Sequence, residues 1–416
     1  MINKQFFFEK IPSALLILLP ISLITGPFIS DLSISIIVII FISKCLVDRN
    51  FSYFKNIYFK YFIAFYFVCL LSSLISDYKL ISSVKSFFYF RFGVFALSVW
   101  YLLSVNKRLI KFIFQSLLLC FLFLIVDGLI QYVYGKNIIG LAKHEIRLSS
   151  FFGDELILGS YVSRFLPILI GTFFLTNYPK KNVNLFFFYF VIIFSIILIY
   201  LTGERAAFLL TIMSITYLTV MLNQYSKFFL IISIVAFFAI TVVNFSNPLI
   251  KERMIGYTKD QIGLSDKTVS STGIYKGHFL IAKDLFLENP ILGVGPKNYT
   301  QHCNKNKKFQ KAPYVCTTHP HNTYIQLLSE TGLVGTLMIF FMFLILSFFS
   351  IKHIYLKLVK KIDTFTFPEI CLLSSILITL WPFITSGSFF NNYLNIIYFF
   401  PIGILIWSRK TKFSYI

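Results

Sequence analysis

Charged residues are scarce in this sequence, and acidic residues are the scarcest. Only 13% of the 416 residues are charged, with 17 Asp and Glu against 38 Lys and Arg, while 57% are hydrophobic. This composition excludes an ordinary soluble domain and is typical of a polytopic membrane protein. The formal charge of +21 does not indicate a nucleic-acid-binding protein, because the basic residues fall mainly between apolar runs and not along one soluble face.

Segments of alternating apolar and polar residues are also missing, which excludes a membrane β-barrel. Continuous apolar runs are present instead, and many reach the roughly 20 residues that a helix needs to cross a bilayer. We therefore predict an all-α, polytopic integral membrane protein with about twelve transmembrane helices. The expected helices are Pro12–Ile29, Leu32–Val47, Tyr58–Ile75, Val84–Leu103, Leu109–Val133, Leu156–Leu175, Leu185–Leu201, Ala206–Leu222, Phe228–Val243, Leu333–Ser350, Ile370–Thr385 and Tyr393–Trp407.

A long polar segment interrupts the apolar runs and divides the chain. Residues 1–243 are expected to hold the first nine transmembrane helices, 244–332 a large loop with short helices, and 333–416 the last three transmembrane helices. The first run lacks a small-residue cleavage site, so it is expected to be retained. Basic residues fall in every second short loop, which predicts cytoplasmic termini and an outward-facing large loop. Within this loop we expect an amphipathic helix over Ile274–Leu287 and a tight turn over Pro290–Pro296.

The cysteines lack the paired C-x-x-C pattern of a zinc site. Four lie in or beside apolar runs, where a cysteine behaves as a small hydrophobe. Cys303 and Cys316 lie in the large loop, on the side expected to be oxidising, and their spacing suits a disulfide. Zinc held with the nearby His302, His319 and His321 is the competing interpretation, but their spacing fits it poorly, and we predict no metal site.

The end of the large loop carries the most informative polar residues. The proline after His319 disfavours helical geometry there, and Thr323 with Gln326 fits a capping box. We therefore expect His321 and Asn322 just ahead of a helix N-terminus, where exposed amides and the helix dipole favour an anion. The same positive end lowers the pKa of His321 and keeps it able to accept a proton. A base beside an anion site indicates group transfer.

Three arginines lie where a charge is costly unless it is paired, hydrated or used on a ligand. Arg205 stands at the outward mouth of the eighth helix, on the same membrane face as His321, and its fork geometry suits a phosphate. A pair between Arg205 and Glu204 is the alternative. Arg164 lies deeper in its helix and serves either a ligand or an internal ion pair. Arg91 lies among aromatic residues, where an ion pair or a cation–π role is favoured.

Further charged residues gather in the two outward segments. Arg147 lies with Asp154 and Glu155 in the shorter one, where either carboxylate could orient His321 or an arginine; capping of the sixth helix by Asp154 is the favoured account. The large loop is itself basic, with Arg253 near its start. A basic outward loop attracts phosphates or anionic lipid heads, although a solvated surface explains any single lysine.

The motifs Gly203–Ala207, Gly293–Tyr299, Thr318–Asn322 and Glu330–Gly332 resemble those of the O-antigen ligases and of the wider group that includes O-antigen polymerases and bacterial O-oligosaccharyltransferases. The resemblance implies a metal-independent transferase without a cofactor. It moves a glycan from a polyprenyl-pyrophosphate carrier to a sugar hydroxyl of lipid A-core, at the periplasmic face of the bacterial inner membrane, among membrane lipids. The resemblance assigns functional roles to His321 as base and Arg205 as pyrophosphate clamp.

The family's further loop arginine is missing from this chain. The matching stretch ends in Lys276, Gly277 and His278, and either Lys276 or His278, or the more distant Arg253, could take its place. Arg147, Arg164, His319 and Asn322 complete the expected substrate-binding residues. Arginines stabilise a departing pyrophosphate, and a neutral histidine takes the acceptor's proton, so attack inverts the anomeric carbon in one step.

Other functions remain open from the sequence. An O-antigen polymerase or an O-oligosaccharyltransferase differs from a ligase only in its acceptor, and the early helices and the Cys303–Cys316 loop favour the ligase. A lipid or polysaccharide transporter, from another class, also suits many helices with intramembrane arginines. No internal repeat is visible, however, and the polar residues gather at the outer face instead of the midplane.

Overall fold

The computed structural model describes residues 4–176, 182–222, 226–261, 271–306 and 316–413. Over these ranges the chain is helical and contains no strand. Eight helices are long and apolar enough to cross a membrane, which confirms the all-α polytopic prediction. The long helices, each of which overlaps one predicted apolar run, are α1 (Ile11–Thr25), α2 (Pro27–Val47), α3 (Ile57–Ile75), α4 (Lys79–Val105), α5 (Leu109–Tyr134), α6 (Leu158–Leu175), α7 (Asn182–Leu201), α8 (Arg205–Met221), α9 (Ser226–Ser246), α15 (Thr323–Lys360), α16 (Phe367–Thr379) and α17 (Asn392–Phe413).

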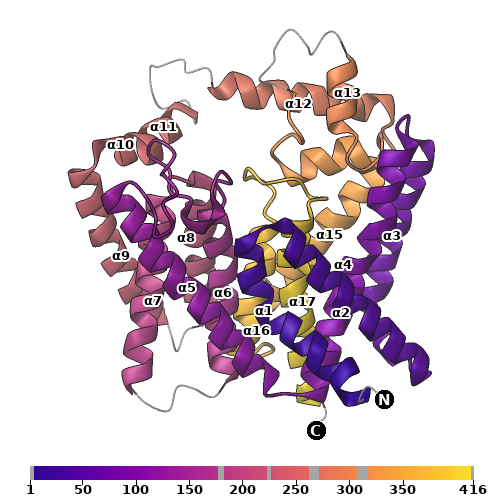
Figure 1. The fold of residues 1–416 in the computed structure, drawn as a ribbon, viewed down its shortest axis with the longest axis horizontal. Helices are drawn as coiled ribbons and strands as arrows, with labels where there is room; N and C mark the ends of the chain where they lie inside the picture. Colours follow the sequence, from indigo (N-terminus) through magenta and orange to yellow (C-terminus); the bar gives the residue numbers. More distant parts are fainter. Residues whose placement is uncertain (1–3, 177–181, 223–225, 262–270, 307–315, 414–416) are drawn as a thin grey trace.

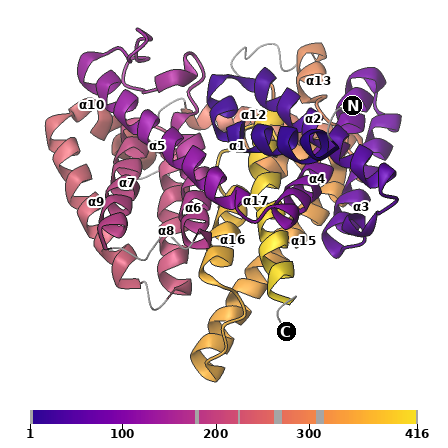
Figure 2. The ribbon, with the colours of Figure 1, turned by 60° about the horizontal axis from the view of Figure 1, so that its bottom comes forward.

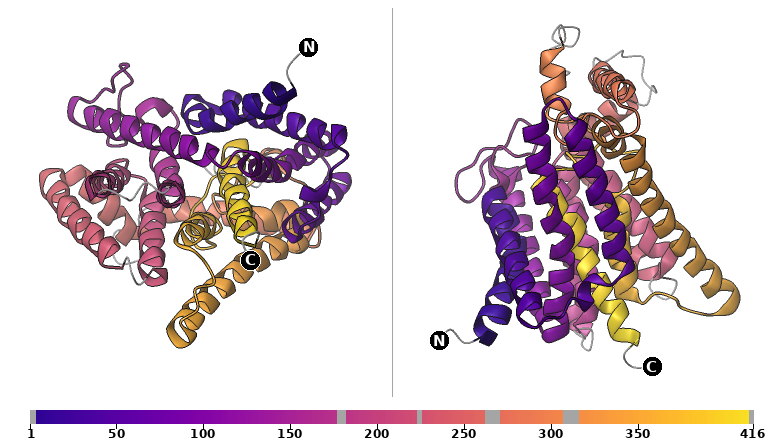
Figure 3. Two further views of the ribbon diagram at one scale, coloured as in Figure 1. Left: turned by 90° about the horizontal axis from the view of Figure 1, so that it is seen from below. Right: turned by 90° about the vertical axis from the view of Figure 1, so that its right-hand side faces the viewer.

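The helices form one bundle with two distinct ends (Figure 1). Both termini lie at one end, which we call the terminus end. The opposite end, the loop end, carries the short helices α10 (Pro248–Lys251), η6 (Glu252–Gly256), α11 (Tyr257–Gln261), α12 (Ser271–Glu288) and α13 (Tyr299–Lys305) (Figures 1 and 3). Helices α5 to α9 form one side of the bundle, and α16 packs on α6 to join them to the rest. The last turns of α15 project from the terminus end (Figure 2).

The first helix boundary differs from the prediction. We expected a break after Ile29, but α1 ends at Thr25 and α2 begins at Pro27. Gly26 between them has φ 133°, a conformation that glycine adopts without a Cβ penalty. Pro27 then takes the first helical position, where a missing backbone N–H costs nothing. The glycine–proline pair therefore sets the boundary within a continuous apolar run.

The predicted membrane helix at Leu333 is the second part of α15, which bends sharply at Gly332. Gly332 has φ 64° and ψ −165°, a region that essentially only glycine occupies. The backbone of the predicted Pro290–Pro296 turn packs into this bend: the Leu333 N–H donates to the Pro290 carbonyl at 2.8 Å, and the Val294 N–H donates to the Ser329 carbonyl at 2.9 Å. A Cβ at Gly332 would lie 2.3 Å from the Ile291 carbonyl oxygen.

The second half of the large loop has its own small core. The amphipathic helix expected over Ile274–Leu287 is α12, and its Ile281 and Leu285 pack with Tyr299 of α13. Cys303 and Cys316 are joined by a disulfide, with Cα atoms 5.6 Å apart. Because α12 also packs on α15, this core connects the loop to the segment that carries the histidines.

Candidate functional site

The structure brings three histidines of the large loop together. The ring of His321 lies 4.3 Å from that of His319 and 5.2 Å from that of His278, measured between centroids. His278 comes from α12, whereas the other two precede α15, so the packing of α12 on α15 creates this histidine group. No group of three His, Cys, Asp or Glu side chains in the described residues is arranged to hold a metal ion.

His319 is engaged through both ring nitrogens. Its Nε2 lies 3.1 Å from the Ser386 carbonyl and its Nδ1 lies 2.9 Å from the Thr318 hydroxyl. The carbonyl can only accept, so Nε2 carries the hydrogen and Nδ1 accepts from the hydroxyl. His319 therefore positions the loop between α16 and α17, and His321 is the better candidate for a proton acceptor.

Asn322, and not Thr323, caps α15. The side-chain Oδ1 of Asn322 accepts from the Tyr324 and Ile325 N–H groups, and its side-chain Nδ2 donates to the Pro382 and Ile384 carbonyls. The predicted Thr323–Gln326 capping box is wrong, because Asn322 occupies the cap and the Gln326 amide donates elsewhere. All four hydrogen-bonding positions of Asn322 are used within the protein, which gives it a structural role.

The environment keeps the paired histidines neutral. Burial and, to a smaller extent, the neighbouring His321 lower the pKa of His319 to about 4. Burial also lowers the pKa of His321, with an additional contribution from His278. His321 has φ 56°, an uncommon conformation for a residue other than glycine, and its carbonyl accepts from the Ser386 N–H at 3.0 Å. A half-buried neutral imidazole held in a strained conformation suits a general base.

Three arginines meet at the mouth of α8. Arg205 is its first residue, and its Nη1 is buried without a hydrogen-bond partner among the described residues. Arg253 of η6 donates from Nε to the Gly203 carbonyl at 2.9 Å, and a Cβ at Gly203 would lie 2.8 Å from that nitrogen. Burial lowers the pKa of the Arg253 guanidinium, and the charges of Arg147 and Arg205 lower it further. Like charges gathered in this way favour an anion between them.

Glu204 has a different partner from the one expected. Its carboxylate accepts from the Gly159 and Ser160 N–H groups at 2.7 and 3.0 Å, so it caps α6. The predicted cap, Asp154, is fully exposed instead. The structure describes no ion pair between Glu204 and Arg205, since the carboxylate is engaged with α6. Burial raises the pKa of Glu204 to about 7, against the opposing effect of these N–H groups.

Arg164 lies inside α6 and is almost completely buried. Its Nη1 donates to the Ser160 hydroxyl at 2.6 Å, and no carboxylate of the described residues pairs with it. Its charge nevertheless acts on Glu204, which caps the same helix. Because α6 packs on both α8 and α16, Arg164 lies in the helix that joins the arginines at α8 to the rest of the bundle.

A buried polar network holds the loop that carries Arg147. Asp127 of α5 accepts from the Ile138 N–H at 2.9 Å and also from the Ser150 hydroxyl. One turn later, the side-chain Oε1 of Gln131 accepts from the Ser150 N–H at 2.8 Å and from the neighbouring Ser149 N–H. The sequence stretch Asp127–Tyr132 weakly resembles the O-antigen ligases, but no role was predicted for these two residues. Two polar residues one turn apart inside an apolar run are the signal that could have identified them.

The candidates for the missing loop arginine have different positions. Arg253 shares the charge field of Arg205, whereas His278 lies with the histidines. Lys276 lies in α12, and its side chain is outside the part of the chain that the structure describes. Burial lowers the pKa of a further cation, Lys297, against the opposing effect of Glu330. Lys297 is close enough to His319 to act on its pKa, and sequence reasoning did not single it out.

The arrangement can bind an anion at three arginines and accept a proton at a neutral histidine. A comparison with curated proteins found no match. A scan of family models matched residues 190–340 to the model described as O-antigen ligase. This segment runs from α7 into α15 and contains Arg205, Arg253, His278, His319 and His321. Residues 190–340 of this membrane protein are therefore similar to the O-antigen ligase family, within the superfamily of glycan transferases of the ligase and polymerase type.

Proposed function

We propose that the chain is a ligase that transfers a glycan from a polyprenyl-pyrophosphate carrier to a sugar hydroxyl of lipid A-core. The observation that carries this proposal is the convergence of the Arg147, Arg205 and Arg253 charges around Gly203. A pyrophosphate is the leaving group that such a cluster would stabilise most. In this account Arg253 takes the role of the loop arginine that the sequence lacks.

The proposed reaction is a single displacement at the anomeric carbon. The acceptor oxygen attacks from the face opposite the pyrophosphate, while the bond between the anomeric carbon and the phosphate oxygen breaks. His321 accepts the hydroxyl proton, since its pKa is lowered and its ring is neutral near pH 7. The electron pair leaves with the pyrophosphate and is stabilised by Arg205 and its neighbours. The anomeric configuration is inverted, and no metal ion or cofactor takes part in the proposal.

The proposed orientation puts the reaction at the periplasmic face of the bacterial inner membrane, with both termini cytoplasmic. The alternation of basic short loops supports it. The disulfide between Cys303 and Cys316 also supports an oxidising compartment for the loop end.

The test compares envelope glycolipids from a deletion strain complemented with wild type, His321→Ala or Arg205→Ala. We expect carrier-linked polymer to accumulate and lipid A-core to remain bare in the deletion strain, with neither variant restoring transfer. Normal transfer by His321→Ala at wild-type protein levels would reject the assigned base. Accumulation of single repeat units on the carrier would instead identify a polymerase, and unchanged glycolipids in the deletion would reject both functions.

A further inference from the structure

One cavity of the bundle lies away from the arginines at α8 and from the histidines. It has a volume of about 340 Å³ and lies between α2, α4 and the start of α17. Its lining includes Asp31, Lys85, Arg91, Phe92 and Asn392. We call it the Asp31–Arg91 pocket. Two cations, one carboxylate and several aromatic rings make it polar and positively charged overall.

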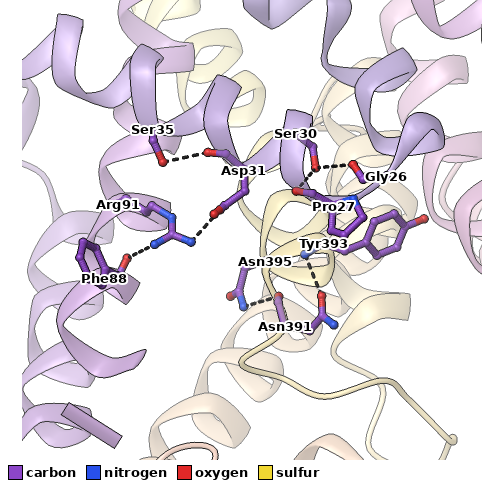
Figure 4. A network of polar contacts seen from close by, with 10 residues as sticks. All are labelled: Gly26, Pro27, Ser30, Asp31, Ser35, Phe88, Arg91, Asn391, Tyr393 and Asn395. Carbon is purple, nitrogen blue, oxygen red and sulfur yellow. Dashed lines mark hydrogen bonds and ion pairs between the residues drawn. The ribbon is translucent and has the colours of Figure 1, made fainter. Parts of the chain in front are cut away.

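Arg91 is held in place but retains hydrogen-bonding capacity. Its Nη2 pairs with Asp31 at 2.6 Å, and its Nη1 donates to the Phe88 carbonyl at 3.2 Å (Figure 4). The guanidinium also lies 4.7 Å from the centroid of the Phe92 ring, so both the ion pair and the cation–π role predicted for Arg91 are confirmed. Its Nε is buried without a partner among the described residues. Each Nη of the guanidinium has a second N–H that can donate to an anion, whereas the buried Nε is shielded from the pocket.

Lys85 is the second cation of the pocket. It lies on α4, nearly two turns before Arg91, with an exposed side chain. It forms no ion pair with any carboxylate in the part of the chain that the structure describes. Since Asp31 is already paired with Arg91, the Lys85 charge is available to a ligand.

The wall around the pocket is apolar and exposed, as expected for a surface that faces lipid. The exposed side chains include Phe28, Ile29 and Leu32 on α2 and Leu80, Val84 and Phe87 on α4. Charged groups in such a wall are costly unless they are paired or bind a ligand, and lipid headgroups are the ligands nearest to such a surface. Asp31 lies roughly 6 Å along α2 from its first residue, in the first turns of that helix.

The pocket is connected to the histidines by the loop between α16 and α17. In the middle of this loop the Ser386 N–H donates to the His321 carbonyl at 3.0 Å. At the end of the loop Asn392 lines the pocket. A second connection runs through charges, since Lys85 acts on Lys297 and Lys297 acts on His319. The loop between α16 and α17 therefore contacts the proposed base and also contributes to the pocket, whose lining does not include the arginines at α8.

We propose that the Asp31–Arg91 pocket binds the phosphate-bearing headgroup of the membrane lipid that accepts the glycan. The guanidinium and ammonium groups fit phosphate oxygens, the volume fits a headgroup, and the acyl chains lie against the exposed apolar faces of α2 and α4. The identification of this lipid as the acceptor rests on the proposed function, whereas the binding of a phosphate headgroup does not.

The binding test uses the full chain in detergent micelles, with retention of phosphatidic acid over phosphatidylcholine measured by native mass spectrometry. We expect Lys85→Gln to weaken phosphatidic acid binding about tenfold, as loss of one charge-assisted hydrogen bond would. Lys79→Gln, on the same helix and outside the pocket, is the matched control and should bind like wild type. Equal binding by Lys85→Gln and wild type would overturn the proposal. Inorganic phosphate should compete only weakly; competition as strong as that of the lipid would overturn the lipid assignment.

A transfer assay separates this inference from the proposed function. Lys85→Gln should raise the KM for the acceptor lipid about tenfold, with kcat and the KM for the carrier-linked donor unchanged. An unchanged acceptor KM would reject the acceptor assignment while transfer itself stands. If Arg205→Ala transfers glycan normally, the proposed function fails. The headgroup site is still supported in that case if Lys85→Gln binds phosphatidic acid more weakly than wild type.

Discussion

The bend at Gly332 is the most demanding backbone feature near the histidines, and Gly332→Ala tests its role. An alanine at φ 64° and ψ −165° costs about 1–3 kcal/mol in backbone strain. Its Cβ would also lie 2.3 Å from the Ile291 oxygen and 2.6 Å from the Gly293 nitrogen, backbone atoms that cannot rotate away. This overpacking adds about 1–3 kcal/mol. We expect a total loss of about 4 kcal/mol and separation of the Pro290–Gly295 turn from α15.

The assay for this variant is thermal unfolding of the purified chain in detergent, together with transfer activity below the transition. A loss of about 4 kcal/mol lowers the melting temperature by roughly 5 °C, given an unfolding entropy of about 2 cal/mol/K per residue. Transfer should fall at least about tenfold where the chain is still folded, because a displacement of about 1 Å at a catalytic group costs more than that.

Gly135→Ala is the matched control for Gly332→Ala. Gly135 has φ 77° at the end of α5, but a Cβ there would have nothing within 4 Å. This variant carries only the left-handed backbone penalty of about 1–2 kcal/mol. If Gly332→Ala is no less stable than Gly135→Ala and transfers glycan normally, the contact between the turn and α15 does not support the site as argued.

The other predictions concern the histidines and the Arg147 loop. Transfer should fall as the pH drops through the pKa of His321. Since the charge of His278 lowers that pKa, His278→Gln should move the acid limb of the kcat/KM profile to higher pH. An acid limb at the wild-type pH would contradict this coupling. The pKa of His319 is about 4 in the folded chain and near 6.5 when unfolded, so the unfolded chain gains protons first as pH falls from 6.5 to 4. The folded chain therefore loses stability as the pH falls. The melting temperature should be lower at pH 5 than at pH 7 in wild type, and the difference should be smaller in His319→Gln. Asp127→Asn places an amide NH₂ against hydrogen-bond donors of the Arg147 loop, so hydrogen exchange of this loop should accelerate. Because Arg147 is then held less firmly, the KM for the carrier-linked glycan should rise about tenfold. Unchanged hydrogen exchange would refute this positioning role.

The membrane helices could be predicted because their signal is local. Each apolar run carries its own length and hydropathy, and the helices overlap the predicted runs. Boundaries were harder to predict within continuous apolar sequence, as the Gly26–Pro27 break shows. The tight turn at Pro290 was predicted from its prolines and glycines, but its docking against Gly332 depends on contacts across about a tenth of the chain.

Most of the expected site residues lie in two groups, the arginines at α8 and the histidines before α15. Their hydrogen-bond and charge partners could not be predicted from the sequence. Arg205 and Arg253 are 48 positions apart and meet only because η6 folds back over Gly203. The carboxylate of Glu204 has an adjacent arginine in sequence, yet it caps α6, since two buried N–H groups require an acceptor. The partners of Asn322 were also not visible in the sequence: its side chain caps α15 and donates to the loop between α16 and α17.

The central claim is that His321 takes the acceptor's proton while the arginines at α8 hold the departing pyrophosphate. The most direct measurement is release of polyprenyl pyrophosphate in a single turnover, with purified chain, carrier-linked glycan and acceptor. His302→Ala, a change to a histidine of α13 outside the site, should behave like wild type. We expect His321→Ala to release no more than about a hundredth of the wild-type amount at equal donor occupancy, as loss of a general base predicts. Release by His321→Ala at the rate of His302→Ala would contradict the account.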